Sequence, residues 1–462
     1  MSPLQLAIDK VGRAVASFHP RTLPLLLRAH YGRELGAWCL LPLMLGALEG
    51  GVVAVIAKTV FSASVHARWL NLAVAILVGA PAFANVVSFL WAAASHGRPK
   101  IRFLVALQVA VAVCVALIAV APAAPIGLFG FTAGVVVARM CWSGVVALRS
   151  TVWRANYPRR VRASLAGKLA TVQALAMTLA AAGIGLAMTA DEGAFRLLFP
   201  LAAVVGLAGA WVYSGLGVRG HRALLRAERS EVGMRGSPIN PLKLRWVLSE
   251  DSLFRRYMTC TFIFGAGNLM VTGPLVIMLN DRFGMPPLTA ILIVSAIPTL
   301  LMPLSIPLWS RLLDRVHVVR FRSVHSWSFV LSTGLLLWGV LAVEPTLLWL
   351  GAIVKGVAYG GGVLGWNLGH HDFAPAQRAS QYMGVHMMLT GIRGLLAPVI
   401  GVSLYEILEA LNTGSGAWTL ALCLALTLIG ALGFVAMRDA AHGRGGEARF
   451  ADGPPIQPPA AS

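Results

Sequence analysis

The sequence predicts an all-α membrane protein with twelve transmembrane helices, arranged as two six-helix bundles related by a pseudo-twofold axis. Three observations lead to this fold class. The chain of 462 residues is 57% hydrophobic and only 12% charged, whereas soluble domains carry about a quarter charged residues. Its apolar residues gather in twelve windows, each close to the ~20 residues that a helix needs to cross a bilayer. Its basic residues concentrate in alternate connections between these windows.

The windows fall into two sets of six, and each is expected to be a helix because a spanning backbone must satisfy its own hydrogen bonds. The first set covers residues 37–58, 69–94, 103–121, 126–148, 165–188 and 194–216. The second set covers residues 257–279, 288–309, 324–343, 346–369, 381–404 and 416–437. The predicted organisation is therefore a cytoplasmic N-terminal segment (1–36), a first bundle (37–216), a cytoplasmic linker (217–256), a second bundle (257–437) and a disordered cytoplasmic tail (438–462).

The basic residues predict the orientation. Of the 38 Lys and Arg, 31 lie in, or at the edge of, alternate connections that begin with the N-terminal segment. The other connections hold four: Lys58, Arg68, Arg196 and Arg282. Because Lys and Arg stay in the cytoplasm during insertion, both termini are expected there. The net charge of +20 thus reflects the topology and does not indicate nucleic-acid binding. The Ala-, Arg- and Gly-rich composition favours a bacterial inner membrane.

An internal repeat relates the two sets of windows. Similar residues recur in the same order at offsets of 216 to 219, namely Gly46 to Glu49 with Gly265 to Asn268, Trp91 with Trp309, Arg139 and Gly144 with Lys355 and Gly360, and Arg162 with Arg378. A duplicated six-helix unit leaves such a pattern. Parallel repeats of this kind are one known transporter design, in which the binding site lies between the halves.

With this repeat, residues 37–437 resemble the major facilitator superfamily. That family carries the pattern Gly-x-x-x-Asp-Arg-x-Gly-Arg-Arg after its second and eighth helices. After the eighth window this chain keeps Asp314-Arg315 and loses both glycines; after the second, Gly97-Arg98-Pro99-Lys100 keeps only the basic end. The resemblance implies a cytoplasmic gate formed by Arg98, Asp314 and Arg315; the alternative is that Arg98 and Arg315 are only topology determinants.

Ionisable and polar residues in the middle of the windows indicate a shared cavity. A charged side chain at a helix centre costs ~2.5–3.5 kcal/mol on insertion scales, so such groups normally face a partner or a cavity. The candidate cavity residues are Glu49, Arg139, Asn268, Lys355, Arg393 and His386. Arg139 and Lys355 occupy matching positions, so the pseudo-twofold axis is expected to place them on opposite sides of one cavity.

Each candidate has an alternative role. Glu49 is a proton carrier if its surroundings are dry, or a partner in a structural ion pair with Arg139 or Arg393. Asn268 lines the cavity or makes an interhelical hydrogen bond, and Arg139 or Lys355 could snorkel to an interface. His386 lies two turns before Arg393 on the same face and is either a packing residue or a proton site.

No metal or other cofactor is expected. The five cysteines fall within windows and show no metal-ligand spacing. His370, His371 and Asp372 are consecutive, and on a helix they point about 100° apart, so they cannot all chelate one ion.

The excess of buried cations favours a secondary transporter for a small organic anion, with proton coupling through Glu49 as a further hypothesis. The expected partners are this solute, protons and the lipid bilayer, with no nucleic acid, and the protein is expected to be a monomer. Two other functions stay open: a drug/proton efflux antiporter, and a non-transporting sensor, scaffold or scramblase of the same fold. An enzyme is not expected, because the sequence contains no nucleophile–base spacing, phosphate loop or metal cluster.

Overall fold

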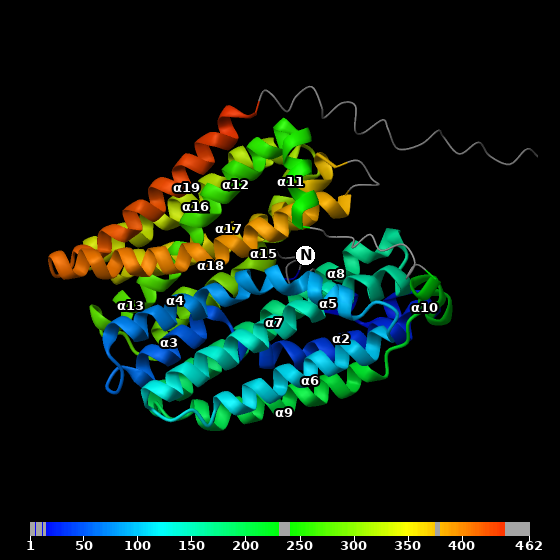
Figure 1. Cartoon of the computed structure of the whole chain (residues 1–462), viewed down its shortest axis with the longest axis horizontal. Coiled ribbons are helices and arrows are strands. Elements are labelled where there is room, and N and C mark those ends of the chain that lie inside the picture. The colour runs from blue at the N-terminus through cyan, green and yellow to red at the C-terminus, as the bar shows by residue number, and fades with distance from the viewer. Residues whose placement is uncertain (1–4, 6–11, 13–14, 231–240, 375–378, 439–462) are drawn as a thin grey trace, which may run out of the picture.

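The computed structural model describes residues 5, 12, 15–230, 241–374 and 379–438. Within these residues, twelve spans are long and apolar enough to cross a membrane, which confirms the predicted fold class. The predicted tail lies, from residue 439 on, outside the described residues, as do parts of the N-terminal segment and of the linker. Six spans form each of two bundles, one above the other in Figure 1.

The first bundle begins with a span that is split into two helices, and its second span ends in the 3-10 turn η2. Its elements are α2 (Leu25–Ala47), α3 (Gly50–Phe61), α4 (Ala67–Phe83), η2 (Ala84–Val87), α6 (Lys100–Ile118), α7 (Pro125–Asn156), α8 (Arg159–Ala190) and α9 (Phe195–Ser214).

The second bundle begins with the paired helices α12 and α13, and a π-helical turn, η4, lies within its second span. Its elements are α12 (Ser252–Met270), α13 (Thr272–Asp281), α14 (Pro287–Ile291), η4 (Leu292–Ala296), α15 (Ile297–Leu313), α16 (Val318–Leu341), α17 (Pro345–Leu368), η5 (Gly369–Asp372), α18 (Ala379–Leu411), η7 (Ser415–Trp418) and α19 (Thr419–Ala436).

Two short helices, α10 (His221–Ser230) and α11 (Pro241–Glu250), belong to the linker, and α5 (Ser88–Ala94) follows the second span. In Figure 1, α10 lies at the right-hand end of the first bundle and α11 near the right-hand end of the second, while α3 and α13 lie toward the left. We call these the linker end and the far end. Neighbouring spans run in opposite directions between the two ends.

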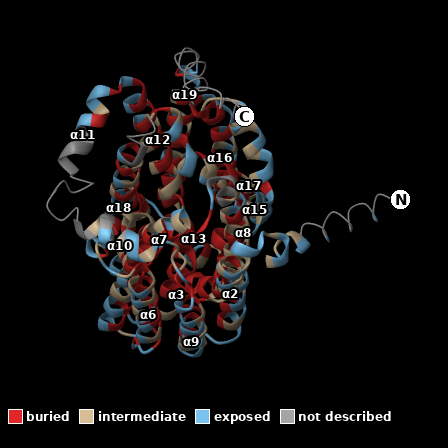
Figure 2. Cartoon of the chain, turned by 90° about the vertical axis from the view of Figure 1, so that its right-hand side faces the viewer, coloured by how far each residue is buried: buried red, intermediate tan, exposed pale blue. Residues whose placement is uncertain are grey.

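The two bundles pack in the same way. In the first, α2 packs against α8 and α9, while α6 packs against α7 and α9. In the second, α12 packs against α18 and α19, while α16 packs against α17 and α19. The buried positions lie inside and the exposed ones along the outer helix faces (Figure 2). This is the packing expected from two copies of one six-helix unit.

A pair of tryptophans shows the repeat at the level of single atoms. The indole Nε1 of Trp91 donates to the carbonyl of Met140, and that of Trp309 donates to the carbonyl of Val357, each over 2.8 Å. The helix α5, which continues from the second span, is thus joined to the fourth span by the same bond that joins the eighth span to the tenth.

The glycines beside these tryptophans correct the predicted register by one residue. A Cβ added to Gly144 would lie 2.7 Å from the ring of Trp91, and one added to Gly361 would lie 3.0 Å from the ring of Trp309. Gly144 therefore corresponds to Gly361 and not to Gly360. The sequence match had followed residue type, whereas the close approach of the tryptophan fixes the position.

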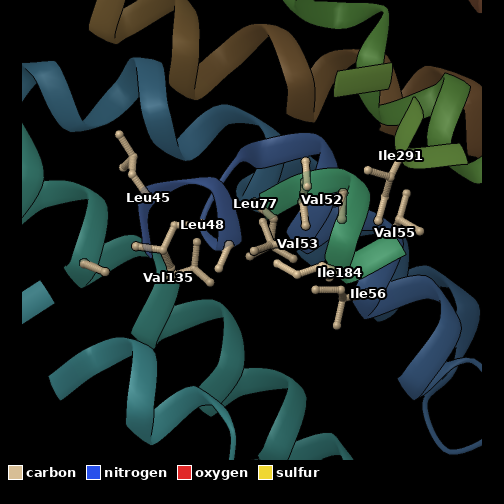
Figure 3. Packing of buried hydrophobic residues seen from close by; sticks show 14 of the residues in the cluster. Leu45, Leu48, Val52, Val53, Val55, Ile56, Leu77, Val135, Ile184 and Ile291 are labelled. Atoms are coloured by element: carbon tan, nitrogen blue, oxygen red, sulfur yellow. The ribbon is translucent and has the colours of Figure 1, made fainter. Parts of the chain in front are cut away.

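The break in the first span lies inside the core. Figure 3 shows Val52, Val55 and Ile56 of α3 among apolar side chains that include Ile184 of α8 and Ile291 of α14. The last two come from different bundles, so α3 packs at the junction between the halves.

Three spans extend six residues or more further toward the linker end than their apolar windows. The first begins at residue 25 instead of 37, the fourth ends at 156 instead of 148, and the ninth begins at 318 instead of 324. Each added segment carries a buried charge that had interrupted the apolar pattern: Glu34, Arg149 and Arg322, which are 0%, 9% and 5% exposed.

Candidate functional site

Glu49 occupies the break in the first span. Its backbone is extended (φ −62°, ψ 135°), and its Oε2 accepts hydrogen bonds from the N–H groups of Gly51 at 2.8 Å and Val52 at 3.2 Å. The first N–H groups of a helix have no intrahelical partner, so Glu49 caps α3 in the way that an acidic N-cap does. Both bonds go to Oε2, and Oε1 takes no part in the cap.

Arg139 satisfies the other side of the same break. It comes from the middle of α7, is 7% exposed, and donates from Nε to the carbonyl oxygen of Leu48 over 2.9 Å. In an unbroken helix that carbonyl would accept from the N–H of Val52, which is bonded to Glu49 instead. The break is therefore completed by one acidic and one basic side chain.

Lys355 has a similar position in the second bundle. It lies in α17, is 4% exposed, and donates from Nζ to Oγ1 of Thr272 over 3.3 Å. Thr272 is the first residue of α13, where the seventh span passes from α12 to α13. A cation from the fourth span thus reaches the break in the first, and a cation from the tenth span reaches the junction in the seventh.

The carboxylate of Glu49 lies within electrostatic reach of both Arg139 and Lys355. We call these three residues the central group. Among the described residues, three pairs of opposite charge lie within 4 Å of each other, and none of them includes a member of the central group. Glu49 is therefore not held in the direct ion pair that was its structural alternative, and the group carries two positive charges and one negative charge.

The other candidate cavity residues make contacts with groups outside the central group. The Nδ2 of Asn268 donates to the carbonyl of Phe264 within its own helix, over 2.8 Å. Arg393 donates from Nη1 to the carbonyl of Thr261 over 2.7 Å, and His386 lies with its ring centroid 5.5 Å from that of Trp366.

Arg393 and His386 lie near each other, as their spacing along one helix predicted. Each is within electrostatic reach of Arg322, and His386 is also within reach of Arg393. Glu49 is not among these neighbours. Of the predicted cavity residues, Glu49, Arg139 and Lys355 form the central group, and Arg393 and His386 belong to a second cluster inside the second bundle. Asn268 belongs to neither.

A polar network joins the two bundles at the far end. Lys58, which is 3% exposed, donates from Nζ to Oδ2 of Asp281 over 2.6 Å and to Oδ1 of Asn71 over 3.2 Å. Asn71 in turn donates to Oε1 of Glu406. These four residues, which we call the far-end network, come from α3, α4, α13 and α18. From the sequence, Lys58 was expected only to be a basic residue between windows.

The other contacts between the bundles also lie toward the far end or the middle. The helix α4 packs against α18, and α8 packs against α14 and η4. Gly394 permits the first of these approaches, because an added Cβ would lie 2.6 Å from the backbone nitrogen of Phe83. Toward the linker end, the helices of the two bundles diverge (Figure 1).

The residues predicted for a gate lie at this linker end, where Arg98, Asp314 and Arg315 are all exposed. Among the basic residues that follow the second span, the buried one is not Arg98 but Lys100. Lys100 is 3% exposed and donates to Oε2 of Glu228 over 2.8 Å.

Glu228 belongs to α10 and also accepts the N–H of Gly97 through Oε2, over 2.8 Å. The linker therefore supplies the carboxylate that the loop after the second span lacks in its own sequence.

A buried ion pair lies within the first bundle near the linker end. The Nε of Arg149 lies 2.8 Å from Oε1 of Glu34, and the hydroxyl of Tyr157 donates to Oε2 over 2.7 Å. The guanidinium of Arg149 stacks on the ring of Trp38, with its Cζ 3.2 Å from the ring centroid. Because each charge has partners, this cluster has the character of a structural element.

Two related six-helix bundles, closed against each other at one end and sharing charged residues between them, define a multi-pass membrane protein of the transporter class. The sequence model of the Major Facilitator Superfamily matches residues 35–398. The match covers most of the chain, and the protein belongs to this superfamily. It is accordingly a transporter and not an enzyme.

Solved transporters share the fold. A D-xylose-proton symporter matches with a TM-score of 0.68 at 12% identity, over 90% of this chain and 99% of that chain. The nucleoside transporter NupG matches with a TM-score of 0.59 at 14% identity, over 90% and 99%. The xylose transporter XylE from E. coli, in a partially occluded inward-open conformation, matches with 0.62 at 10% identity, over 86% and 96%. A comparison with curated protein sequences found no match.

Proposed function

We propose that this protein is a secondary active transporter that moves a small anionic organic solute across the membrane by alternating access. The observation that carries the proposal is the charge of the central group. Arg139 and Lys355 approach one carboxylate, that of Glu49, from different bundles, and neither cation is paired with it directly. The remaining positive charge favours an anion at the junction of the halves.

The positive-inside rule assigns the linker end to the cytoplasm, because that end carries the basic N-terminal segment and linker. Both termini are then cytoplasmic, in a bacterial plasma membrane. The far-end network closes the extracytoplasmic side, and the divergence of the bundles faces the cytoplasm (Figure 1). On this assignment, the structure represents an inward-facing state.

Proton coupling through Glu49 follows from the same geometry. Its Oε2 is occupied by the α3 cap, while Oε1 is available to a proton or to the solute. Protonation removes the only negative charge of the central group and so increases its attraction for an anion. A proton and an anion that bind together in this way would cross in the same direction.

The test is uptake into proteoliposomes with an imposed pH gradient, using anionic solutes first identified by their thermal stabilisation of the purified protein. Lys355→Ala and Arg139→Ala are expected to weaken the apparent affinity for the solute. Glu49→Gln is expected to abolish gradient-driven uptake while counterflow continues. Glu192→Gln, at an exposed position, is the matched control.

Unchanged solute affinity in both cation variants would remove the anion proposal. Gradient-driven uptake that persists in Glu49→Gln would remove proton coupling alone.

Drug/proton antiport is the second candidate, and one observation favours it: Glu49 is half-buried and has no direct ion pair in the described part of the chain. Such a carboxylate can bind a cationic solute in exchange for a proton. Increased drug resistance of an overexpressing strain, lost in Glu49→Gln, would favour this function over anion transport.

A further inference from the structure

A second group of cations lies inside the second bundle, toward the linker end. Arg322 comes from α16, and His386 and Arg393 come from α18. Arg322 is 5% exposed and His386 is 2% exposed. The charged neighbours of His386 are Arg393, Arg322 and His370, and that of Arg393 is Arg322. All of these neighbours are basic. We call Arg322, His386 and Arg393 the cation cluster.

Each member of the cation cluster has a buried nitrogen without a hydrogen-bond partner among the described residues. These atoms are Nε of Arg322, Nε of Arg393 and Nε2 of His386. Arg393 does bond to the protein, but through Nη1, to the carbonyl of Thr261. Buried polar groups are normally hydrogen-bonded, and one that is not costs folding free energy. Three such groups close together indicate that an acceptor from outside the chain completes them.

Two glycines make room for the guanidinium groups. A Cβ added to Gly365 of α17 would lie 2.7 Å from Nη2 of Arg322. A Cβ added to Gly265 of α12 would overlap Nη1 of Arg393. Both arginines are therefore fixed by close packing against helix backbone, and are not extended toward an interface. Two spans supply the cluster and two more enclose it.

The buried ion pair of the first bundle provides a comparison. Arg149 is also buried, but Glu34 supplies a carboxylate at 2.8 Å. Arg322 is as deeply buried and Arg393 is half-buried, and neither has a carboxylate partner within 4 Å among the described residues. In the described part of the chain, the structural Arg149 thus has a counter-ion, whereas the cation cluster has none.

We propose that the cation cluster binds an oxyanion group, a carboxylate or a phosphate, of the solute that the protein transports. This inference rests on the proposed transport function and extends its anion site to Arg322, in a span that contributes nothing to the central group. The planar guanidinium matches the geometry of carboxylate and phosphate oxygens, and such a group offers enough acceptors for the three unpartnered nitrogens. The central group, which contains Glu49, then binds another part of the solute.

The test uses the full chain in detergent, with inorganic phosphate, sulfate and acetate as probes and chloride at equal ionic strength as the reference. The melting temperature of the wild type is expected to rise with the logarithm of the concentration of at least one oxyanion above its Kd. Arg322→Gln and Arg393→Gln are expected to lose this rise. Arg320→Gln, which changes an exposed arginine on the same helix, is expected to keep it.

A second readout separates binding from a structural role. Without any oxyanion, Arg322→Gln is expected to melt no lower than the wild type, because the substitution removes a buried charge that has no counter-ion. A structural arginine gives the opposite result. If Arg322→Gln does not fold, His386→Gln and Arg393→Gln provide the same comparison.

Two results would overturn the assignment: a wild type that no oxyanion stabilises relative to chloride, or stabilisation that is equal in the wild type and in the cluster variants. Gradient-driven flux that continues in such a case leaves the transport function intact. Conversely, oxyanion binding that depends on Arg322 in a protein without flux for any solute supports the cluster and removes the transport proposal.

Discussion

Arg139 Nε lies 2.9 Å from the carbonyl oxygen of Leu48, directly beside the break in the first span. The break leaves a carbonyl without its helical partner, and an unpaired carbonyl in a membrane interior is costly. A side chain that was predicted only to line a cavity thus also completes the backbone of another helix. The guanidinium of Arg139 can both complete this backbone and line the cavity, because Nε makes the bond to Leu48 while the Nη groups are left for other partners.

Removing this bond should reduce stability. Arg139→Ala leaves the Leu48 carbonyl unpaired, at a cost of about 1–3 kcal/mol. We expect a lower melting temperature in detergent for this variant, measured without solute. Arg315→Ala removes an exposed arginine and should leave the melting temperature unchanged. Equal melting temperatures for Arg139→Ala and the wild type would show that the bond is not formed in solution.

Two variants of Glu49 should separate its role as the cap of α3 from its role in proton coupling. Glu49→Gln keeps an acceptor oxygen for the N–H groups of Gly51 and Val52, so its melting temperature should stay close to that of the wild type. Glu49→Ala removes the cap and should cost about 1 kcal/mol. Loss of gradient-driven uptake in a fully stable Glu49→Gln protein then identifies the charge itself as essential. A Glu49→Gln variant as unstable as Glu49→Ala would contradict this separation.

The far-end network should hold the far end closed. Asp281 is 42% exposed, so its pair with Lys58 contributes about 1 kcal/mol, equivalent to about a fivefold change in population. Lys58→Met is expected to shift the protein toward a state that is open at the far end. Spin labels at positions 62 and 282, in a background without the native cysteines, should show a larger long-distance fraction in this variant.

Asp281→Asn should produce the same shift as Lys58→Met, because it removes the other partner of the pair. Glu192→Gln should leave the distance distribution unchanged. A distribution that is identical in all three variants would mean that apolar packing alone closes the far end.

The architecture could be predicted from sequence because bilayer thickness and the placement of Lys and Arg constrain each span separately. Contacts between spans are not constrained in this way. Glu34, Arg149 and Arg322 interrupted their apolar windows and were assigned to connections, although each is buried. Burial of these charges depends on partners or packing from other helices, which no single window contains.

Only part of the candidate site could be predicted, because contacts between spans are not visible in any single window. Glu49, Arg139 and Lys355 stood out because they lie near the centres of apolar windows, and the repeat placed two of them on opposite sides of one axis. Lys58 and Asp281 lie at helix ends, where a charge is ordinary, so nothing in the sequence distinguished them from solvated residues. Their pairing is visible only once α3 and α13 are side by side.

The pair of Glu34 and Arg149 should be essential for stability and not for solute recognition. Removing one partner of a buried ion pair typically costs 3–5 kcal/mol, because the other charge is left unpaired. Glu34→Gln is therefore expected to lower the melting temperature strongly. The double variant Glu34→Met, Arg149→Met should recover much of this loss, and a double variant less stable than Glu34→Gln would contradict the structural assignment.

The repeated tryptophan contact gives a prediction that tests the relation between the two bundles. At Gly144 an added Cβ would lie 2.7 Å from both Trp91 and Leu107, and at Gly361 an added Cβ would meet the rings of His325 and Trp309. Gly144→Ala and Gly361→Ala should therefore each cost about 1–3 kcal/mol through overpacking.

Gly183→Ala is the matched control, because nothing lies within 4 Å of its added Cβ, and a helical glycine replaced by alanine gains about 0.5–1 kcal/mol. Melting temperatures should fall for the first two variants and rise slightly for the third. Since Gly360 is the position that residue type alone would match to Gly144, a loss at Gly144 without one at Gly361 would show that the second bundle does not repeat the packing of the first.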